Sequence, residues 1–266
     1  MSKTKFIIIA VIIYLIWILA TYLLEGRINL LQTPNPFARL IYAVIANMII
    51  GTVIAIWLLK PPILQRFVSP KQLGFQSSAK RVIIAVVVAG LVGFALFIIQ
   101  KPASLNPIVI LNVFSQTLPG SIAEVIVCWA LVGTTFESMF FKYNSKRLVS
   151  IILAATVSTI LFGIYHFAHS PPFNQPNLVV FLMYPGFLTS IVYFVGRDVY
   201  AAIAFHNFQA LFGVMNNINI ESLLHPIYPV IMMATASIAI LVLSDLLAIR
   251  KTKVNLGSAS EPIRNR

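Results

Sequence analysis

Three side chains capable of acid–base chemistry lie inside long apolar stretches of this chain. Glu124 lies in the run Leu118-Pro-Gly-Ser-Ile-Ala-Glu-Val-Ile-Val-Cys-Trp129, and His166 and His206 lie in two later apolar runs. A carboxylate in lipid is costly unless it is paired, protonated or hydrated, so such residues usually mark function. A carboxylate with an imidazole can act as a general base on water, and a second imidazole can donate to a developing oxyanion. We therefore predict that Glu124, His166 and His206 form an intramembrane catalytic site.

Zinc binding is a competing use of the same residues. One Glu and two His with an open position form a known catalytic zinc set, so Glu124, His166 and His206 would be the ligands if a metal is bound. The chain has no HExxH motif, and its single cysteine, Cys128, excludes an internal disulfide. The residues alone leave both uses open, a site without a cofactor or a zinc site.

Glu124 also has a structural interpretation. Ser121-Ile-Ala-Glu124 has the S-x-x-E form of a capping box and follows Pro119-Gly120. In a capping box the Glu side chain accepts from the first backbone N–H groups of a helix. A helix break at Pro119-Gly120 would therefore make Glu124 a cap, and this geometry would also hold its carboxylate still.

The histidines differ in their surroundings. His166 lies near the end of an apolar run, and Phe162, four residues earlier, shares its helical face. His169 and His225 are interpreted as interfacial residues at helix ends, because each lies close to a proline.

His206 belongs to an unusually polar patch with Asn207 and Gln209. Polar residues within a membrane span usually face the bundle interior. The alternative to a catalytic role for this patch is hydrogen bonding between helices.

The composition predicts an all-α, polytopic membrane protein. Hydrophobic residues make up 59% of the 266 residues, and charged residues only 10%. Lipid admits only helices or closed barrels, and these apolar runs are too long for barrel strands. We expect one membrane domain at 1–250 and a polar cytoplasmic tail at 251–266. About eight transmembrane helices are expected, at 6–24, 38–59, 82–100, 118–141, 148–169, 178–196, 200–218 and 227–249.

The basic residues predict the topology. Sixteen of the 19 Lys and Arg residues fall in the termini and alternate loops on one side, and the exceptions are Arg27, Arg39 and Lys101. Cytoplasmic segments carry the excess of Lys and Arg, so both termini are expected in the cytoplasm of a multi-pass protein of the cell membrane. The net charge of +12 is explained by this distribution, and nucleic acid is not an expected partner.

Three short motifs occur in successive apolar runs. Glu124 begins a form of E-E-x-x-x-R in which Val125 replaces the second Glu and Trp129 replaces Arg. Phe162 and His166 give F-x-x-x-H. The third motif, H-x-x-x-N or H-x-x-x-D, is met at His206 but ends in Ala210.

In this order the motifs resemble the CAAX prenyl protease type II family, whose prokaryotic relatives are called the CPBP or abortive-infection family. The resemblance covers about 70–218 and includes the loop Pro70-Lys-Gln-Leu-Gly-Phe75. It implies a helical bundle around a hydrophilic cavity and endoproteolysis of a protein or peptide substrate, with lipidated substrates and membrane lipid as partners. Glu124 and His166 would activate water, and His206 would stabilise the oxyanion.

The replaced motif positions leave a second function class open. A catalytically inactive relative would keep the bundle and act as a membrane scaffold, immunity-type or regulatory protein. A proton-coupled transporter is less favoured, because the chain shows no inverted repeat.

The expected spans place the candidate residues at different depths. Glu124 and His166 fall toward the outer side and His206 toward the inner side, roughly 10 Å apart in depth. A broken or shifted fourth helix would remove this separation.

Overall fold

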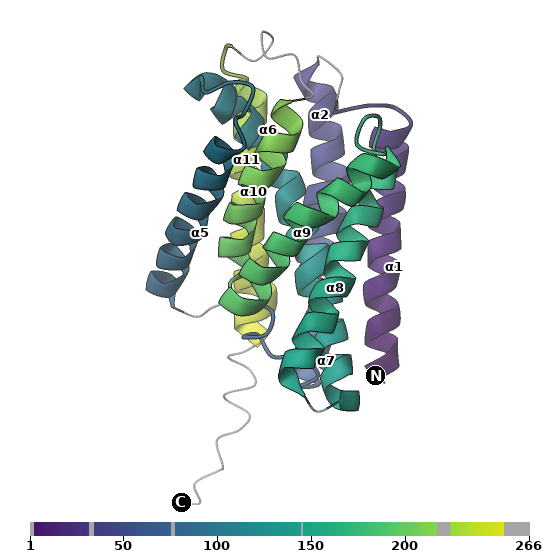
Figure 1. The fold of residues 1–266 in the computed structure, drawn as a ribbon. Coiled ribbons are helices and arrows are strands. Elements are labelled where there is room, and N and C mark those ends of the chain that lie inside the picture. Colours follow the sequence, from purple (N-terminus) through teal and green to yellow (C-terminus); the bar gives the residue numbers. More distant parts are fainter. Residues whose placement is uncertain (1–2, 32–34, 76–77, 145, 217–223, 253–266) are drawn as a thin grey trace, which may run out of the picture.

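The computed structural model describes residues 3–31, 35–75, 78–144, 146–216 and 224–252, and within these ranges the chain is helical without strands (Figure 1). The helices are α1 (Lys3–Thr21), η1 (Tyr22–Gly26), α2 (Pro36–Tyr42), η2 (Ala43–Ile54), α3 (Ala55–Leu58), α4 (Lys60–Leu64), α5 (Ala79–Ile99), α6 (Pro107–Glu124), η3 (Val125–Gly133), α7 (Thr134–Asn144), α8 (Arg147–Tyr165), η4 (His166–Ala168), α9 (Pro176–Gly196), α10 (Val199–Met215), α11 (Tyr228–Ser244) and η6 (Asp245–Arg250).

The predicted all-α membrane bundle is confirmed. Seven helices of the described chain are long and apolar enough to cross a membrane, and they coincide with seven of the expected spans. The remaining expected span, 200–218, corresponds to Val199–Met215, a shorter apolar helix of 17 residues. The expected tail beyond Thr252 lies outside the described residues.

The start of the fourth span was predicted wrongly. The helix begins at Pro107, where Asn106 accepts a hydrogen bond from the backbone N–H of Ile108 at 2.9 Å, and it continues to Tyr143. Asn and Pro at these two positions are typical of a helix start. Pro119 lies inside the helix and does not divide it. Prolines are tolerated in membrane helices because neighbouring groups satisfy the backbone that they disturb.

This long helix lies at the centre of the bundle. In an apolar stretch of 18 residues within this helix, 94% of the residues are buried. The corresponding share in the other membrane-length helices is 17–50%. η3 is wound more widely than an α-helix, and all nine of its residues are buried. The segment with the most protein around it is therefore the one that carries Glu124.

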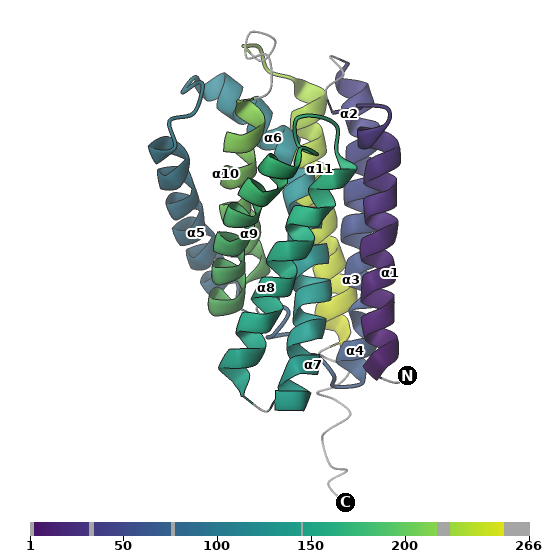
Figure 2. The same cartoon turned by 45° about the vertical axis from the view of Figure 1, so that its right-hand side comes forward.

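The helices alternate in direction, so the ends of the bundle differ (Figures 1 and 2). The first turn of α1, α4, α7 and η6 lie at one end, which we call the terminal end. The connections between α1 and α2 and between α8 and α9 lie at the opposite end, which we call the distal end. The two ends of the described chain thus lie on the same side of the bundle. An even number of membrane crossings requires this arrangement.

Candidate functional site

Glu124 and His206 form a buried hydrogen-bonded pair. Glu124 Oε2 lies 2.7 Å from His206 Nε2, and the residues are 8% and 1% exposed. The expected separation in depth was therefore wrong. Because the fourth helix begins at Pro107, Glu124 lies well inside it and reaches the level of His206 on α10.

The capping interpretation of Glu124 was also wrong. Ser121 lies inside α6 and Glu124 is its last residue, but the helix continues directly into η3, so the backbone N–H groups here are used within one continuous helix. The Ser121 hydroxyl instead donates to Asn207 Oδ1 at 2.9 Å, and the Glu124 carboxylate is directed to His206. The carboxylate is therefore held by a side chain of another helix.

Both ring nitrogens of His206 are engaged by hydrogen-bonding groups. Nε2 contacts the Glu124 carboxyl, and Nδ1 lies 2.8 Å from Thr189 Oγ1. The Thr189 hydroxyl also lies 2.9 Å from the Pro185 carbonyl, one turn earlier on α9. The imidazole is therefore held between α6 and α9.

His166 packs against the same Phe162 ring as His206. His166 Nδ1 lies 2.8 Å from the Phe162 carbonyl oxygen, which can only accept, so Nδ1 carries the proton. The Phe162 ring packs edge-on against both imidazoles, with centroid distances of 4.7 Å to His166 and 5.0 Å to His206. The neutral His166 ring therefore has its lone pair on Nε2. No hydrogen bond of the described residues joins His166 to Glu124.

A cavity of about 410 Å³ brings the three candidate residues together. Glu124, His166 and His206 all line it, on α6, η4 and α10. The wall also carries polar residues from the first third of the chain, namely Glu25, Arg39, Tyr42 and Asn47. Polar and titratable side chains that meet in one cavity of an apolar bundle usually mark a functional site.

His169 is part of this cavity wall, contrary to its interpretation as an interfacial residue. Its ring stacks on that of His166 with a centroid distance of 5.4 Å, and it is 8% exposed. Burial disfavours the charged imidazole and lowers the pKa of His169 from its ordinary value near 6.5 to about 3. His169 therefore stays neutral beside His166. His225, by contrast, is exposed and does not line the cavity.

The polar patch after His206 makes contacts between helices, as its alternative interpretation predicted. Asn207 Oδ1 accepts from Thr117 and Ser121, both at 2.9 Å, and its Nδ2 donates to the Phe114 carbonyl. Gln209 Oε1 accepts from Gln100 at 3.3 Å. Only His206 of this patch is bonded to Glu124.

Asn47 was not singled out from the sequence, although it lines the same cavity. Its Oδ1 accepts from Trp17 Nε1 at 3.4 Å, which orients the amide. Its Nδ2 lies 3.9 Å from the point that a Cβ atom on Gly120 would occupy. Gly120 is one helical turn, about 6 Å, before Glu124. An amide donor thus lies on the wall of the same cavity, beside the helix that carries Glu124.

Arg39 was assigned to an outer loop, but it is buried at 6% exposure and lines the cavity. Its Nη1 donates to Gln116 Oε1 at 2.7 Å. The sequence offered no pattern for Asn47 or Arg39, because each is a single polar residue near or within an apolar run.

The candidate zinc ligands do not form a metal-binding group. Over the described ranges no three His, Cys, Asp or Glu side chains come close enough together to hold a metal ion. Both nitrogens of His206 are already hydrogen-bonded, so a metal at this position would have to displace Glu124 or Thr189.

All three candidate residues lie between Pro119 and Phe212, and this segment matches the family model described as type II CAAX prenyl endopeptidase Rce1-like. Residues 119–212 are Rce1-like. The match confirms the resemblance and identifies a family of peptide hydrolases. It does not include the loop at 70–75. No curated protein and no solved structure matches the chain.

Three residues of the Rce1-like segment replace residues of the family motifs, and each has a defined place in the structure. Trp129, at the position of the motif Arg, donates through Nε1 to Ser190 Oγ at 2.7 Å and lies 5.5 Å from the His206 ring, centroid to centroid. Val125, at the position of the second Glu, is completely buried. Ala210, at the end of the third motif, lines the cavity and offers no hydrogen-bond donor. Trp129 thus links the central helix to α9 in place of an Arg.

Proposed function

We propose that this protein is an intramembrane peptide hydrolase in which Glu124 activates water. The observation that carries the proposal is the Glu124–His206 hydrogen bond of 2.7 Å on the wall of a 410 Å³ cavity within the Rce1-like segment. In the carboxylate form, Glu124 accepts a proton from a cavity water as its oxygen bonds to the peptide carbonyl carbon. The same proton then passes to the leaving amine as the C–N bond breaks, and this step returns Glu124 to the carboxylate form.

His206 supports Glu124 in this proposal. Its Nδ1 lies 2.8 Å from Thr189 Oγ1, and its Nε2 lies 2.7 Å from Glu124 Oε2. A hydrogen bond from the His206 Nε2–H group to Glu124 stabilises the carboxylate form that water activation requires. Because both of its nitrogens are engaged, His206 is not placed to donate to an oxyanion, which is the role that the family resemblance implied.

His166 is the second contact for the attacking water. Its Nδ1–H is held by the Phe162 carbonyl, so its Nε2 lone pair is available to accept a hydrogen bond. A water between Glu124 and His166 would be oriented by two acceptors. Orientation of this kind lowers the entropic part of the barrier.

Asn47 is the donor that we assign to the oxyanion. Ala210 leaves the family's usual position without an N–H group, while Asn47 Nδ2 is directed toward Gly120 in the same cavity. A fixed amide donor at a developing negative charge is the arrangement found in oxyanion holes.

We further propose that the reaction proceeds without a metal. The hydrogen bonds of His206 and the Nδ1–Phe162 contact of His166 fit a site organised by proton transfer. Stoichiometric zinc in the purified protein, with turnover lost on chelation and restored by zinc, would overturn this part of the proposal.

The substrate is a peptide segment of a protein, and lipid-modified segments are included. A second, largely apolar cavity of about 220 Å³ shares Phe173, Leu182 and Pro185 with the first. Such a neighbouring space suits an apolar substrate group. The test is cleavage of a panel of prenylated and unmodified peptides by the purified protein, with and without chelator. Cleavage by wild type and its loss in Glu124→Gln are expected.

A catalytically inactive membrane protein is the second candidate function. It is favoured by the replaced motif positions, where Val125, Trp129 and Ala210 carry neither charge nor the expected amide. In that case the Glu124–His206 pair would only join α6 to α10. Absence of cleavage across the whole panel, with a folded protein, would favour this candidate.

A further inference from the structure

The cavity is reached from the distal end of the bundle. Its wall includes Leu31 in the connection after α1, Pro172 and Phe173 in the connection between α8 and α9, and Val214 in the last turn of α10. All of these segments lie at the distal end in both views (Figures 1 and 2). Glu124 and His206 therefore form the deep part of a space whose mouth lies away from the termini.

The terminal side of the cavity is closed by solid packing. The nine residues of η3, directly after Glu124, are all buried, and Trp129 is completely inaccessible. Trp129 is bonded to Ser190 on α9, and Ser190 in turn lies 3.0 Å from Thr159 on α8. Three helices thus meet on the terminal side of the Glu124–His206 pair, and the residues that join them are buried.

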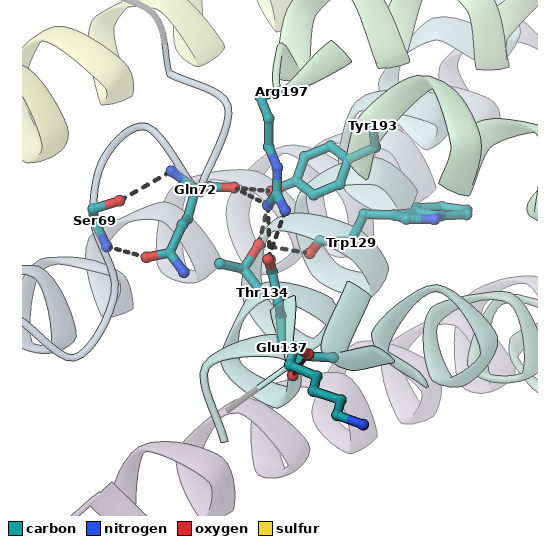
Figure 3. Close-up of polar contacts among 9 residues, drawn as sticks. Ser69, Gln72, Trp129, Thr134, Glu137, Tyr193 and Arg197 are labelled. Carbon is teal, nitrogen blue, oxygen red and sulfur yellow. Dashed lines mark hydrogen bonds and ion pairs between the residues drawn. The ribbon is translucent and has the colours of Figure 1, made fainter. Parts of the chain in front are cut away.

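A polar network secures this closure nearer the terminal end (Figure 3). Arg197 forms a two-pronged ion pair with Glu137, with N–O distances of 2.6 and 2.7 Å, and also donates to the Gln72 carbonyl. Tyr193 bonds to the same carbonyl and to Thr134 Oγ1. The network joins the loop before α5 to the ends of the central helix and α9, so this side of the bundle is tied together.

The basic residues identify which end faces the cytoplasm. The terminal end carries the helix ends and loops with Lys60, Lys71, Lys142 and Arg147, and these are part of the majority of basic residues. The distal end carries only Arg27, Arg39 and Lys101. By the positive-inside rule the terminal end is cytoplasmic and the distal end lies outside.

We infer that the Glu124–His206 cavity opens to the extracytoplasmic face of the membrane. The direction of access stands independently of the proposed hydrolysis, while the kind of substrate rests on it. The substrate is then an extracytoplasmic segment of a protein that has already been inserted or exported. A soluble cytoplasmic protein could not reach Glu124 without passing the closed terminal side.

Thiol labelling in intact cells tests the inference without relying on activity. Single cysteines are introduced at Leu31 in the cavity mouth, at Leu105 on the distal surface and at Lys71 on the terminal surface, in a Cys128→Ser background. Leu105 is 60% exposed and Lys71 is exposed, so both substitutions are expected to be tolerated. Cys128 is completely buried, so wild type is expected to stay unlabelled and is the alternative background if Cys128→Ser impairs folding.

A membrane-impermeant maleimide is expected to label Leu31→Cys and Leu105→Cys in intact cells, and Lys71→Cys only after permeabilisation. Labelling of Lys71→Cys from outside, with the other two protected, would overturn the orientation. Labelling of Leu105→Cys while Leu31→Cys stays unreactive from both sides would overturn the open mouth. A failure of the proposed hydrolysis would appear separately, as absence of peptide cleavage with an unchanged labelling pattern.

Discussion

Glu124 Oε2 and His206 Nε2 lie 2.7 Å apart, although 82 residues separate them in the sequence. The contact joins the middle of the central helix to α10 and, with Thr189 behind it, fixes a chain of hydrogen bonds from α9 to α6. A carboxylate held in this way keeps its position and still faces a cavity that carries other polar side chains on its wall. The predictions below test what this arrangement does.

Thr189→Val is expected to reduce turnover by roughly ten- to a hundred-fold, because a lost buried hydrogen bond costs about 1–3 kcal/mol. Val keeps the shape of Thr but leaves His206 Nδ1 without its hydrogen-bond partner. The matched control is Thr156→Val, since Thr156 is an exposed Thr on α8 that bonds only to the backbone of its own helix. Initial cleavage rates of both variants provide the measurement. Equal cleavage rates for Thr189→Val and Thr156→Val would show that Thr189 does not support His206.

Asn47→Asp is expected to lower kcat by about 10²–10³-fold with little change in KM, the usual loss when one oxyanion donor is removed. Asp keeps an acceptor for Trp17 but has no N–H group. The control is Trp17→Phe, which removes the opposite contact of Asn47 and leaves its Nδ2 in place. Steady-state kinetics on one peptide separate kcat from KM. A rise in KM alone would make Asn47 a binding residue.

Single substitutions in the Arg197–Glu137 pair are expected to lower the thermal unfolding temperature strongly. Burial opposes the charge of Arg197, but the hydrogen bonds and charge of Glu137 outweigh it, so the pKa of Arg197 is raised. Arg197→Gln leaves Glu137 buried without its partner, a loss of about 3–5 kcal/mol for a buried pair. The double variant Arg197→Gln with Glu137→Gln should lose less than the sum of the single variants. Strict additivity would show that the pair does not act as a unit.

His169 is expected to make the fold sensitive to acid. Its pKa is lowered to about 3 in the folded protein, so the unfolded chain binds more protons between that value and the ordinary pKa near 6.5. This contribution to stability is fully present above about pH 6.5 and is lost as the pH falls toward 3. His169→Phe keeps a ring against His166 and removes the titration. Unfolding temperatures in detergent at pH 7 and pH 5 should therefore fall less in the variant than in wild type.

Most spans could be predicted from the sequence because an apolar run of membrane length has few alternatives. The fourth span was the exception, and its residues explain why. Its first half holds Asn112, Ser115, Gln116 and Thr117, and its mean hydropathy of 1.5 is the lowest of the membrane-length helices. Gln116 and Thr117 line the cavity, and Asn112 bonds to the backbone of His225 in the connection before α11. The features that build the site are therefore the ones that obscured the helix.

The site could be predicted only in part, for a related reason. Glu124, His166 and His206 are conspicuous because charged or titratable residues are rare in apolar runs. Thr189, which bonds to His206, and Asn47, on the wall of the same cavity, are not conspicuous, since they resemble any other polar residue of a membrane helix. Which histidine contacts Glu124 depends on helix depth and rotation, and an error of eleven residues in one helix start was enough to hide the pair.

The central claim is that Glu124 acts as a base, and Glu124→Gln tests it most directly. Gln keeps the size and hydrogen-bonding shape of Glu but cannot accept a proton from water. The matched control is Glu25→Gln, because Glu25 is another buried carboxylate of the same cavity, bonded to Ser170 and to the Leu31 backbone. We expect peptide cleavage by Glu124→Gln to fall at least about a hundred-fold, the lower range for general-base catalysis, while Glu25→Gln retains activity. Turnover of Glu124→Gln at the wild-type rate, with thermal stability intact, would contradict the mechanism.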